Sequence, residues 1–245
     1  MENAPVIMIV GHKVKPEHRE RFGKWVMEVY YPLCMKFPQL GAVDRYETIN
    51  ETVAYPKNIT FHQYKDFKAS DEFVRSSVYT SIMQDQKTTF VDTGRMEWHW
   101  RALYELMKSF RTATTGAPGN QSENGPVMHF EAYRLFPDEE DRYSDWIGRW
   151  GFEFYIPALM RLPGIKKYSF YRLLDYKFPE SLRPKGSGIH PAYLSAIYFD
   201  SLEAYQNYEK SIEVAAMRQA LQEHFDRNLE LKWSIQYKQI LSMQK

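Results

Sequence analysis

Short apolar runs and segments of helical spacing alternate along the first half of the chain. Residues 6–10 form a continuous apolar run, which is typical of a buried strand. Between 17 and 36, apolar side chains recur every three or four positions, which predicts an amphipathic helix that ends before Pro38. The predicted strands are 6–10, 43–49, 59–64 and 96–106, and the predicted helices are 17–36 and 70–86, the second with Ser70 as its N-cap.

The second half of the chain repeats the first. Residues 24–38 and 149–163 share Trp, Glu, Tyr, Pro, Met and Pro at one constant offset, and 5–16 aligns with 126–137 without a gap. Each copy has the order β-α-β-β-α-β of the ferredoxin-like split unit. In the second copy we expect strands at 127–135, 167–174, 193–199 and 229–240 and helices at 142–161 and 202–225.

The repeat predicts two domains. Residues 111–125 are rich in Gly, Ser, Thr and Asn and have no apolar periodicity, so we expect a flexible linker between a first unit at 1–110 and a second at 126–245. In each unit the helices cover one sheet face, and the other face must also be covered. The predicted fold class is therefore α+β, with two tandem ferredoxin-like units whose sheets pack into a pseudo-dimeric α/β barrel.

Composition narrows the choice of partners and compartment. A hydrophobic fraction of 44% can build a sizeable core, and a net charge of +1 with interspersed signs argues against nucleic acid as a partner. No apolar run approaches the roughly 20 residues of a membrane span. The N-terminus lacks a basic region followed by an apolar run. We expect a soluble, cytoplasmic protein that has no membrane partner, with Cys34 as a buried apolar group.

The element order and two recurring positions resemble a known superfamily. A strand that ends in Pro16 or Pro137, followed by a helix with Tyr eight residues before Pro, resembles the EthD and stress-responsive branches of the dimeric α/β-barrel superfamily. These branches include cofactor-free monooxygenases, muconolactone isomerases, a plant polyketide cyclase and a hydroxynitrile lyase. The resemblance implies a pocket between the sheet and helices of each unit. In cyclase-like members a His on the first strand and a Tyr on the first helix line it, which match His129 and Tyr155, and a further His falls in the region of His224.

The two copies differ most in polarity along one face of the first strand. The matching positions are Met8, Val10, His12 and Val14 in the first copy and His129, Glu131, Tyr133 and Leu135 in the second. The first copy is thus mostly apolar there, which predicts a degenerate pocket. In the second copy we interpret the face as an acid–base cluster: His129 as base or acid, Glu131 as its orienter, and Tyr133 and Tyr155 as donors to a developing oxyanion. A satisfied buried polar network and an exposed strand face remain alternatives.

The predicted function is cofactor-independent acid–base chemistry on a small aromatic or largely apolar molecule, by a lyase, isomerase or cyclase. A cofactor-free monooxygenase of aromatic compounds and a non-catalytic binding or stress protein are the alternatives, and a homodimer stays open. No cofactor is expected, and the alternatives are a divalent metal at His129, Glu131 and His224 or a haem as in related tandem barrels. The candidate catalytic residues are His129, Glu131, Tyr133, Tyr155 and His224, and the candidate substrate-binding residues are Trp146, Trp150, Glu153, Trp233 and, on a longer loop that is either a lid or a plain insertion, Arg183.

Overall fold

A computed structural model describes residues 5–49, 57–112, 126–135, 146–179, 190–225 and 229–245. Only the backbone is described at 97–99, 134–135, 146–149, 224–225, 229–230 and 233. The chain forms two compact units: unit 1 comprises the described parts of 1–106, 173–190 and 240–245, and unit 2 comprises those of 107–172 and 191–239. The predicted linker lies outside the described residues beyond position 112.

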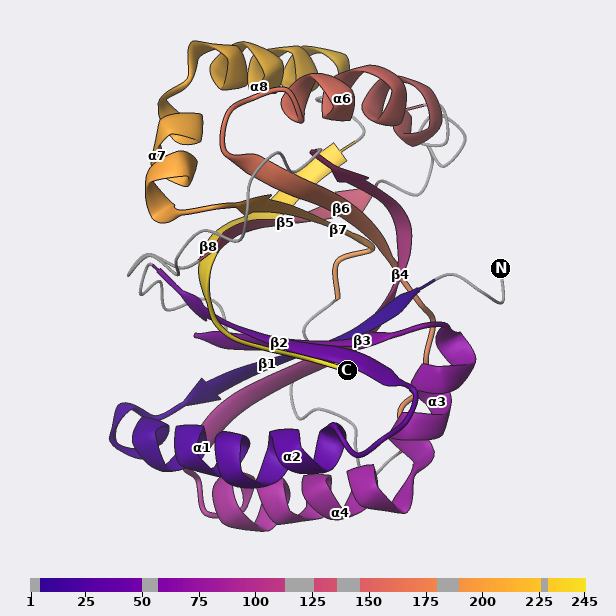
Figure 1. The fold of residues 1–245 in the computed structure, drawn as a ribbon, viewed down its shortest axis with the longest axis vertical. Coiled ribbons are helices and arrows are strands. Elements are labelled where there is room, and N and C mark those ends of the chain that lie inside the picture. Colours follow the sequence, from indigo (N-terminus) through magenta and orange to yellow (C-terminus); the bar gives the residue numbers. More distant parts are fainter. Residues whose placement is uncertain (1–4, 50–56, 113–125, 136–145, 180–189, 226–228) are drawn as a thin grey trace. The chain divides into compact units, whose positions relative to one another are not determined.

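Unit 1 is an antiparallel sheet with helices on one face (Figure 1). The central strand β3 pairs with β1 and β2, and β1 also pairs with β4. The strands are β1 (Val6–Val14), β2 (Leu40–Thr48), β3 (Asn58–Tyr64) and β4 (Met96–Arg111), of which β4 continues into unit 2. The helices are η1 (Pro16–His18), α1 (Arg19–Trp25), η2 (Val26–Tyr30), α2 (Tyr31–Cys34), α3 (Phe67–Arg75), α4 (Ser77–Gln86) and η3 (Lys87–Val91).

Unit 2 repeats this plan, with β7 paired to β5 and β6, and β5 paired to β8. Its strands are β5 (Val127–Leu135), β6 (Ile165–Leu173), β7 (Tyr193–Phe199) and β8 (Leu229–Gln244), and its helices are η5 (Trp146–Tyr155), α6 (Ile156–Leu159), α7 (Leu202–Lys210) and α8 (Ile212–Phe225). Hydrogen bonds join the described strands in the closed order β1-β3-β2-β8-β5-β7-β6-β4. The predicted α+β class and barrel topology are confirmed.

The second helix of each unit is broken where one continuous helix was expected. Ser76 and Ser211 adopt extended conformations, with ψ of 148° and 133°, and each caps the helix that follows. Their hydroxyls accept from the N–H groups of Tyr79 and Val214, which satisfies a helix end that would otherwise lack a partner. The prediction of Ser70 as the cap of α3 is wrong. Asp66 is the N-cap, because its carboxylate accepts from the N–H of Ala69.

The helix-covered face of each sheet carries the core. In unit 1, Met8, Val10 and Val14 of β1 are buried with helix residues such as Phe22 and Phe73, as the strand alternation predicts. Cys34 belongs to the same cluster and is fully buried. None of the helices in the described part of the chain is long and apolar enough to cross a bilayer.

A segment that follows β6 also packs in unit 1. The N–H of Leu174 donates to the carbonyl of Leu103 at 2.9 Å, and Phe178 is buried in the unit 1 core. The Tyr176 hydroxyl donates to Asp71 of α3 at 2.7 Å. The described start of the longer loop in the second copy is therefore part of unit 1 rather than a free surface insertion.

Candidate active site

Three side chains on one face of β5 form the centre of the candidate site in unit 2. His129, Glu131 and Tyr133 alternate along the strand, so their side chains leave it on the same side. His129 is 2% exposed, and its ring stacks on Tyr205 at 5.6 Å and lies 6.3 Å from the ring of Tyr208. Both tyrosines belong to α7, so the imidazole faces the helical layer rather than solvent.

The carboxylate of Glu131 accepts hydrogen bonds from three side chains. Its Oε1 lies 3.0 Å from His129 Nε2, and its Oε2 accepts from the hydroxyls of Tyr133 at 2.5 Å and Ser195 at 3.0 Å. Burial by itself raises the pKa of Glu131. The attraction of His129 and the three hydrogen bonds outweigh burial and lower this pKa to about 2. The carboxylate is therefore ionised at neutral pH although most of it is buried.

Both ring nitrogens of His129 have partners on the protein. Nε2 faces Glu131, with Ser234 Oγ 3.2 Å away, and Nδ1 lies 3.2 Å from the amide nitrogen of Gln236. An ionised carboxylate can only accept, so it holds the ring proton on Nε2. In the neutral imidazole Nδ1 is then the acceptor, and the Gln236 amide donates to it. Nδ1 is therefore the basic atom of this site.

Tyr155 and Trp150 of η5 add aromatic surface to unit 2, with their rings stacked at 5.2 Å and 24°. Burial, followed by the negative charge of Glu131, raises the pKa of Tyr155, so its hydroxyl keeps its proton. Among the described residues no side chain forms a hydrogen bond with this hydroxyl. Tyr155 is therefore a donor with free capacity close to the Glu131 charge, whereas the Tyr133 hydroxyl is already used on the carboxylate.

The remaining predicted site residues do not join this cluster in the described structure. Glu153 is exposed on η5 and makes no described contact with it. Arg183 lies outside the described residues, and only the backbone is described at Trp146, His224 and Trp233. The roles predicted for these residues remain predictions.

The donor set in unit 2 fits an acid–base pair better than a metal or haem site. Among the side chains that the structure describes, no group of three or more His, Cys, Asp or Glu could hold a metal ion. A zinc or haem iron needs an imidazole nitrogen directed at the metal. Both nitrogens of His129 are instead directed at protein groups.

Three polar partners of the pair were missed by the sequence analysis. In the sheet register, Ser195 of β7 and Ser234 of β8 lie opposite Glu131, and Gln236 of β8 lies opposite His129. Alternation places a residue on a face, but it does not say which residue of another strand lies beside it. The register of the folded sheet was needed to find these side chains.

Unit 1 also buries an imidazole on the helix-covered face of its sheet, on a strand other than the first, and the prediction that its pocket is degenerate stays a prediction. His62 of β3 is fully buried, and its Nε2 lies 2.8 Å from the Tyr30 hydroxyl. Burial lowers the pKa of His62 to about 3, so the ring is neutral and accepts from Tyr30. His62 lies directly opposite Met8, whereas in unit 2 His129 lies opposite Ile197. The imidazole has thus changed strands between the copies.

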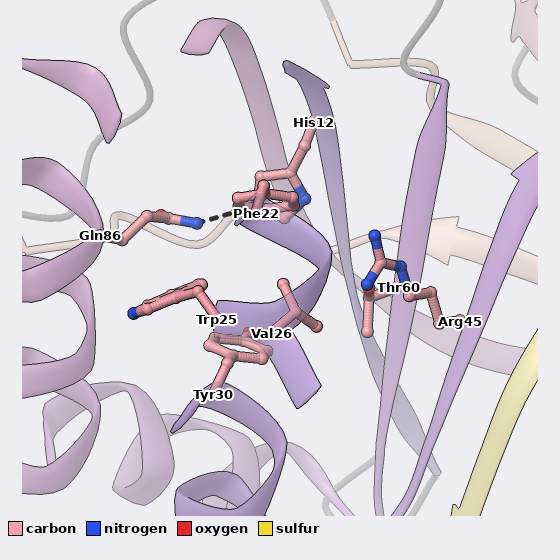
Figure 2. A pocket seen from close by; sticks show the side chains of 8 residues that line it. All are labelled: His12, Phe22, Trp25, Val26, Tyr30, Arg45, Thr60 and Gln86. Atoms are coloured by element: carbon pink, nitrogen blue, oxygen red, sulfur yellow. Dashed lines mark hydrogen bonds between the residues drawn. The ribbon is translucent and has the colours of Figure 1, made fainter. Parts of the chain in front are cut away.

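A narrow cavity lies between the sheet and the helices of unit 1 (Figure 2). His12 reaches it from β1, Arg45 from β2 and Thr60 from β3. Gln86 reaches it from α4, and its amide lies 3.1 Å from His12 Nε2. His12 is 5% exposed and is therefore buried in the unit. The full lining is His12, Phe22, Trp25, Val26, Tyr30, Arg45, Thr60 and Gln86.

Comparisons with known proteins identify the fold. No protein-family model matches the chain, and no curated protein matches its sequence. A solved structure described as an anthrone oxidase-like protein has a TM-score of 0.64 at 14% identity, over 99% of this chain and 94% of that one. A Fusobacterium nucleatum protein whose name proposes a monooxygenase gives 0.63 at 9% identity, over 100% and 96%. A mutant chlorite dismutase from Candidatus Nitrospira defluvii gives 0.56 at 12%, over 98% and 92%.

The chain has the fold of these solved structures, an α/β barrel built from two ferredoxin-like units. The likeness covers nearly the whole of each chain, so both repeats take part in it. At these identities the likeness establishes the fold alone, and one fold hosts many chemistries. The function of this chain therefore has to be inferred from the side chains of the site.

Proposed function

We propose that unit 2 is a cofactor-independent acid–base site that moves a proton on a small aromatic or largely apolar molecule, as a lyase, isomerase or cyclase. The observation that carries the proposal is the buried pair of His129 and Glu131, 3.0 Å apart. A purely apolar core would avoid the cost of burying these groups, which is several kcal/mol without partners. At the positions equivalent to His129 and Glu131, unit 1 carries Met8 and Val10 instead.

In this proposal His129 is the base. Its Nδ1 takes a proton from carbon or oxygen of the substrate, which displaces the Gln236 amide from that nitrogen. Glu131 holds the Nε2 proton and stabilises the imidazolium that forms. The negative charge left on the substrate oxygen is met by the Tyr155 hydroxyl, which has no partner among the described residues. His129 then returns the proton at another atom, or to a leaving group.

The aromatic surroundings favour a flat, mostly apolar substrate. The stacked rings of Trp150 and Tyr155 and the tyrosines that lie over His129 offer flat apolar surface next to a few hydroxyls. The resemblance to aromatic-processing branches of the superfamily agrees with this class.

Proton abstraction from the substrate can be measured by deuterium exchange, which does not require the final product to be known. The protein is incubated in D2O with small enolisable benzylic ketones, such as 2-tetralone and 2-indanone, and loss of the α-proton signal is followed by NMR. We expect wild-type protein to accelerate exchange and His129→Ala to lose about 10²-fold or more, the usual contribution of a positioned base. Glu131→Gln should lose most of the rate, and Glu203→Gln, an exposed carboxylate on α7, should lose none. Equal exchange by wild type and His129→Ala across the panel contradicts the proposal.

A cofactor-free oxygenase is the second candidate, because two structures of similar fold carry oxidase or monooxygenase in their names. The first step is the same proton removal, after which the carbanion gives electrons to O2. With anthrone as the probe, the methylene carbon loses two hydrogens and gains one oxygen, and the other oxygen leaves as water. Oxygen uptake that depends on His129 selects this candidate, whereas α-proton exchange without oxygen uptake selects the lyase or isomerase. Ultracentrifugation of the same samples shows whether the active species is one chain or a homodimer.

A further inference from the structure

The two units carry opposite charges in one equivalent row of the sheet. In unit 2 this row is Glu131, Ser195 and Phe170, which lie opposite one another on β5, β7 and β6. In unit 1 the same row is Val10, Thr60 and Arg45 on β1, β3 and β2. A carboxylate on the first strand of one copy is thus replaced by a guanidinium on the second strand of the other copy. The hydroxyl residue in the middle of the row is kept.

Arg45 is a buried cation without a carboxylate partner. Its residue is 7% exposed, its guanidinium contacts Asn58 Oδ1 at 3.4 Å and lies 5.8 Å from the Phe22 ring, and the Tyr31 hydroxyl lies beside it. Within the described ranges of the chain, no Asp or Glu forms an ion pair with it. A buried charge is costly unless an opposite charge compensates it. The described chain therefore supplies no anion that compensates the charge of Arg45.

The cavity next to Arg45 is lined by hydrogen-bond donors and aromatic rings. Thr60, Gln86, His12 and Arg45 can all donate, and no carboxylate belongs to the lining. The aromatic residues are Phe22, Trp25 and Tyr30, with Val26 between them in the sequence. Such a lining matches a ligand with a negatively charged end and a flat apolar body.

The cavity also limits the size of the ligand. As the side chains stand, the cavity has no room for a free water molecule. A ligand can therefore enter only by turning aside a flexible lining side chain, of which Gln86 is the longest neutral one. This requirement favours a ligand no larger than a single ring.

We propose that the unit 1 cavity binds a small aromatic monocarboxylate, with the carboxylate on Arg45 and Thr60 and the ring among Phe22, Trp25 and Tyr30. Arg45 presents two N–H groups in the geometry that a carboxylate accepts. This site lies in unit 1 and does not depend on the chemistry proposed for unit 2. Its ligand is an effector or a substrate of the first copy.

Benzoate is the probe for this site, and binding is measured by isothermal titration calorimetry and by the shift of the melting temperature. We expect a Kd on the order of 0.1 to 1 mM for the wild-type chain. Benzamide, which has the same shape without the charge, should bind at least about tenfold more weakly, and so should acetate, which lacks the ring. His129→Ala should bind benzoate like the wild type, which separates this site from the one in unit 2.

Arg45→Met is the decisive variant, and Arg21→Met, an exposed arginine on α1, is its matched control. We expect Arg45→Met to abolish benzoate binding and to raise the melting temperature without ligand, because an uncompensated buried charge is removed. Gln86→Ala should bind benzoate more tightly than the wild type, because it widens the cavity. The proposal is overturned if benzoate fails to bind the wild type, if Arg45→Met binds it as well as Arg21→Met does, or if Arg45→Met melts lower than the wild type. If acetate binds as tightly as benzoate, the proposal that the cavity recognises an aromatic ring is overturned.

Discussion

His129 and Glu131 lie two positions apart on β5, and their side chains meet, with Nε2 and Oε1 3.0 Å apart. Residues at this spacing start about 7 Å apart along a strand, so the two side chains must lean toward each other. Tyr133, two positions further along, also leans toward Glu131 and donates to it at 2.5 Å. One strand thus supplies an imidazole, a carboxylate bonded to it and a hydroxyl that donates to that carboxylate, with Glu131 in the middle.

Replacing Glu131 with Gln should change the acid dependence of folding. The folded-state pKa of Glu131 is about 2, below its usual 4.5, so the carboxylate contributes stability that is present above about pH 4.5 and is lost as pH falls toward 2. The contribution at neutral pH is about 3 kcal/mol. We expect urea unfolding of Glu131→Gln to show this deficit at pH 7 and the difference from the wild type to shrink steadily below pH 4.5.

Glu203→Gln serves as the control, because Glu203 is exposed on α7 and has no described role in the site. Its unfolding free energy should follow the wild type at every pH. A constant difference between Glu131→Gln and the wild type from pH 7 to pH 2 would show that Glu131 acts through packing rather than charge.

His62 should make the free energy of unfolding depend on pH over a separate range. Burial lowers its pKa from 6.5 to about 3, so the neutral ring contributes stability that is present above pH 6.5 and is lost as pH falls toward 3. The contribution is on the order of 4 kcal/mol. His62→Gln, which keeps an acceptor for Tyr30, should flatten the stability curve between pH 6.5 and 5. Tyr30→Phe removes the hydrogen bond at 2.8 Å but keeps the slope, because the imidazole stays buried. A His62→Gln curve with the wild-type slope would contradict this assignment.

Gly164 and Gly94 form a matched pair for testing how α7 is placed. Both have positive φ, 83° and 68°, but a Cβ on Gly164 would lie 2.6 Å from Ala204 Cβ, whereas a Cβ on Gly94 would meet nothing within 4 Å. Gly94→Ala should cost about 1 to 2 kcal/mol through backbone strain alone. Gly164→Ala should cost about 1 to 3 kcal/mol more, because it presses on α7.

The same substitution should also reach the site, because α7 carries Tyr205 and Tyr208 against His129. Adding Ala204→Gly to Gly164→Ala should recover part of both stability and activity. Equal losses in Gly164→Ala and Gly94→Ala, measured by thermal unfolding, would mean that α7 yields freely and does not fix the imidazole.

Replacing Phe178 tests how firmly the segment that follows β6 is packed in unit 1. Its side chain is buried in unit 1 and lies 5.7 Å from the Arg101 guanidinium. Phe178→Ala should lower the unfolding free energy by about 3 to 5 kcal/mol. Phe154→Ala, at a position that is 62% exposed, should change it by no more than about 0.5 kcal/mol. Similar melting temperatures for the two variants would show that the segment is only loosely attached.

The local sequence predicted most of the elements and one face of the site. Apolar periodicity is a property of neighbours along the chain, so it placed the strands and helices and put His129, Glu131 and Tyr133 on one side of β5. It failed at Ser76 and Ser211, where a serine that can end one helix and cap the next looks like an ordinary helix residue.

The repeat in the sequence predicted two units of one plan, and the difference in polarity between the copies indicated His129 as a candidate site residue. Tertiary structure decided which side chains these residues meet. Ser195, Ser234 and Gln236 come from other strands. The register of the sheet places Arg45 opposite Thr60 and His62 opposite Met8, and the local sequence does not predict these neighbours. The physical reason is that hydrogen bonding and ion pairing act between atoms a few ångströms apart, while the chain separates those atoms by tens of residues.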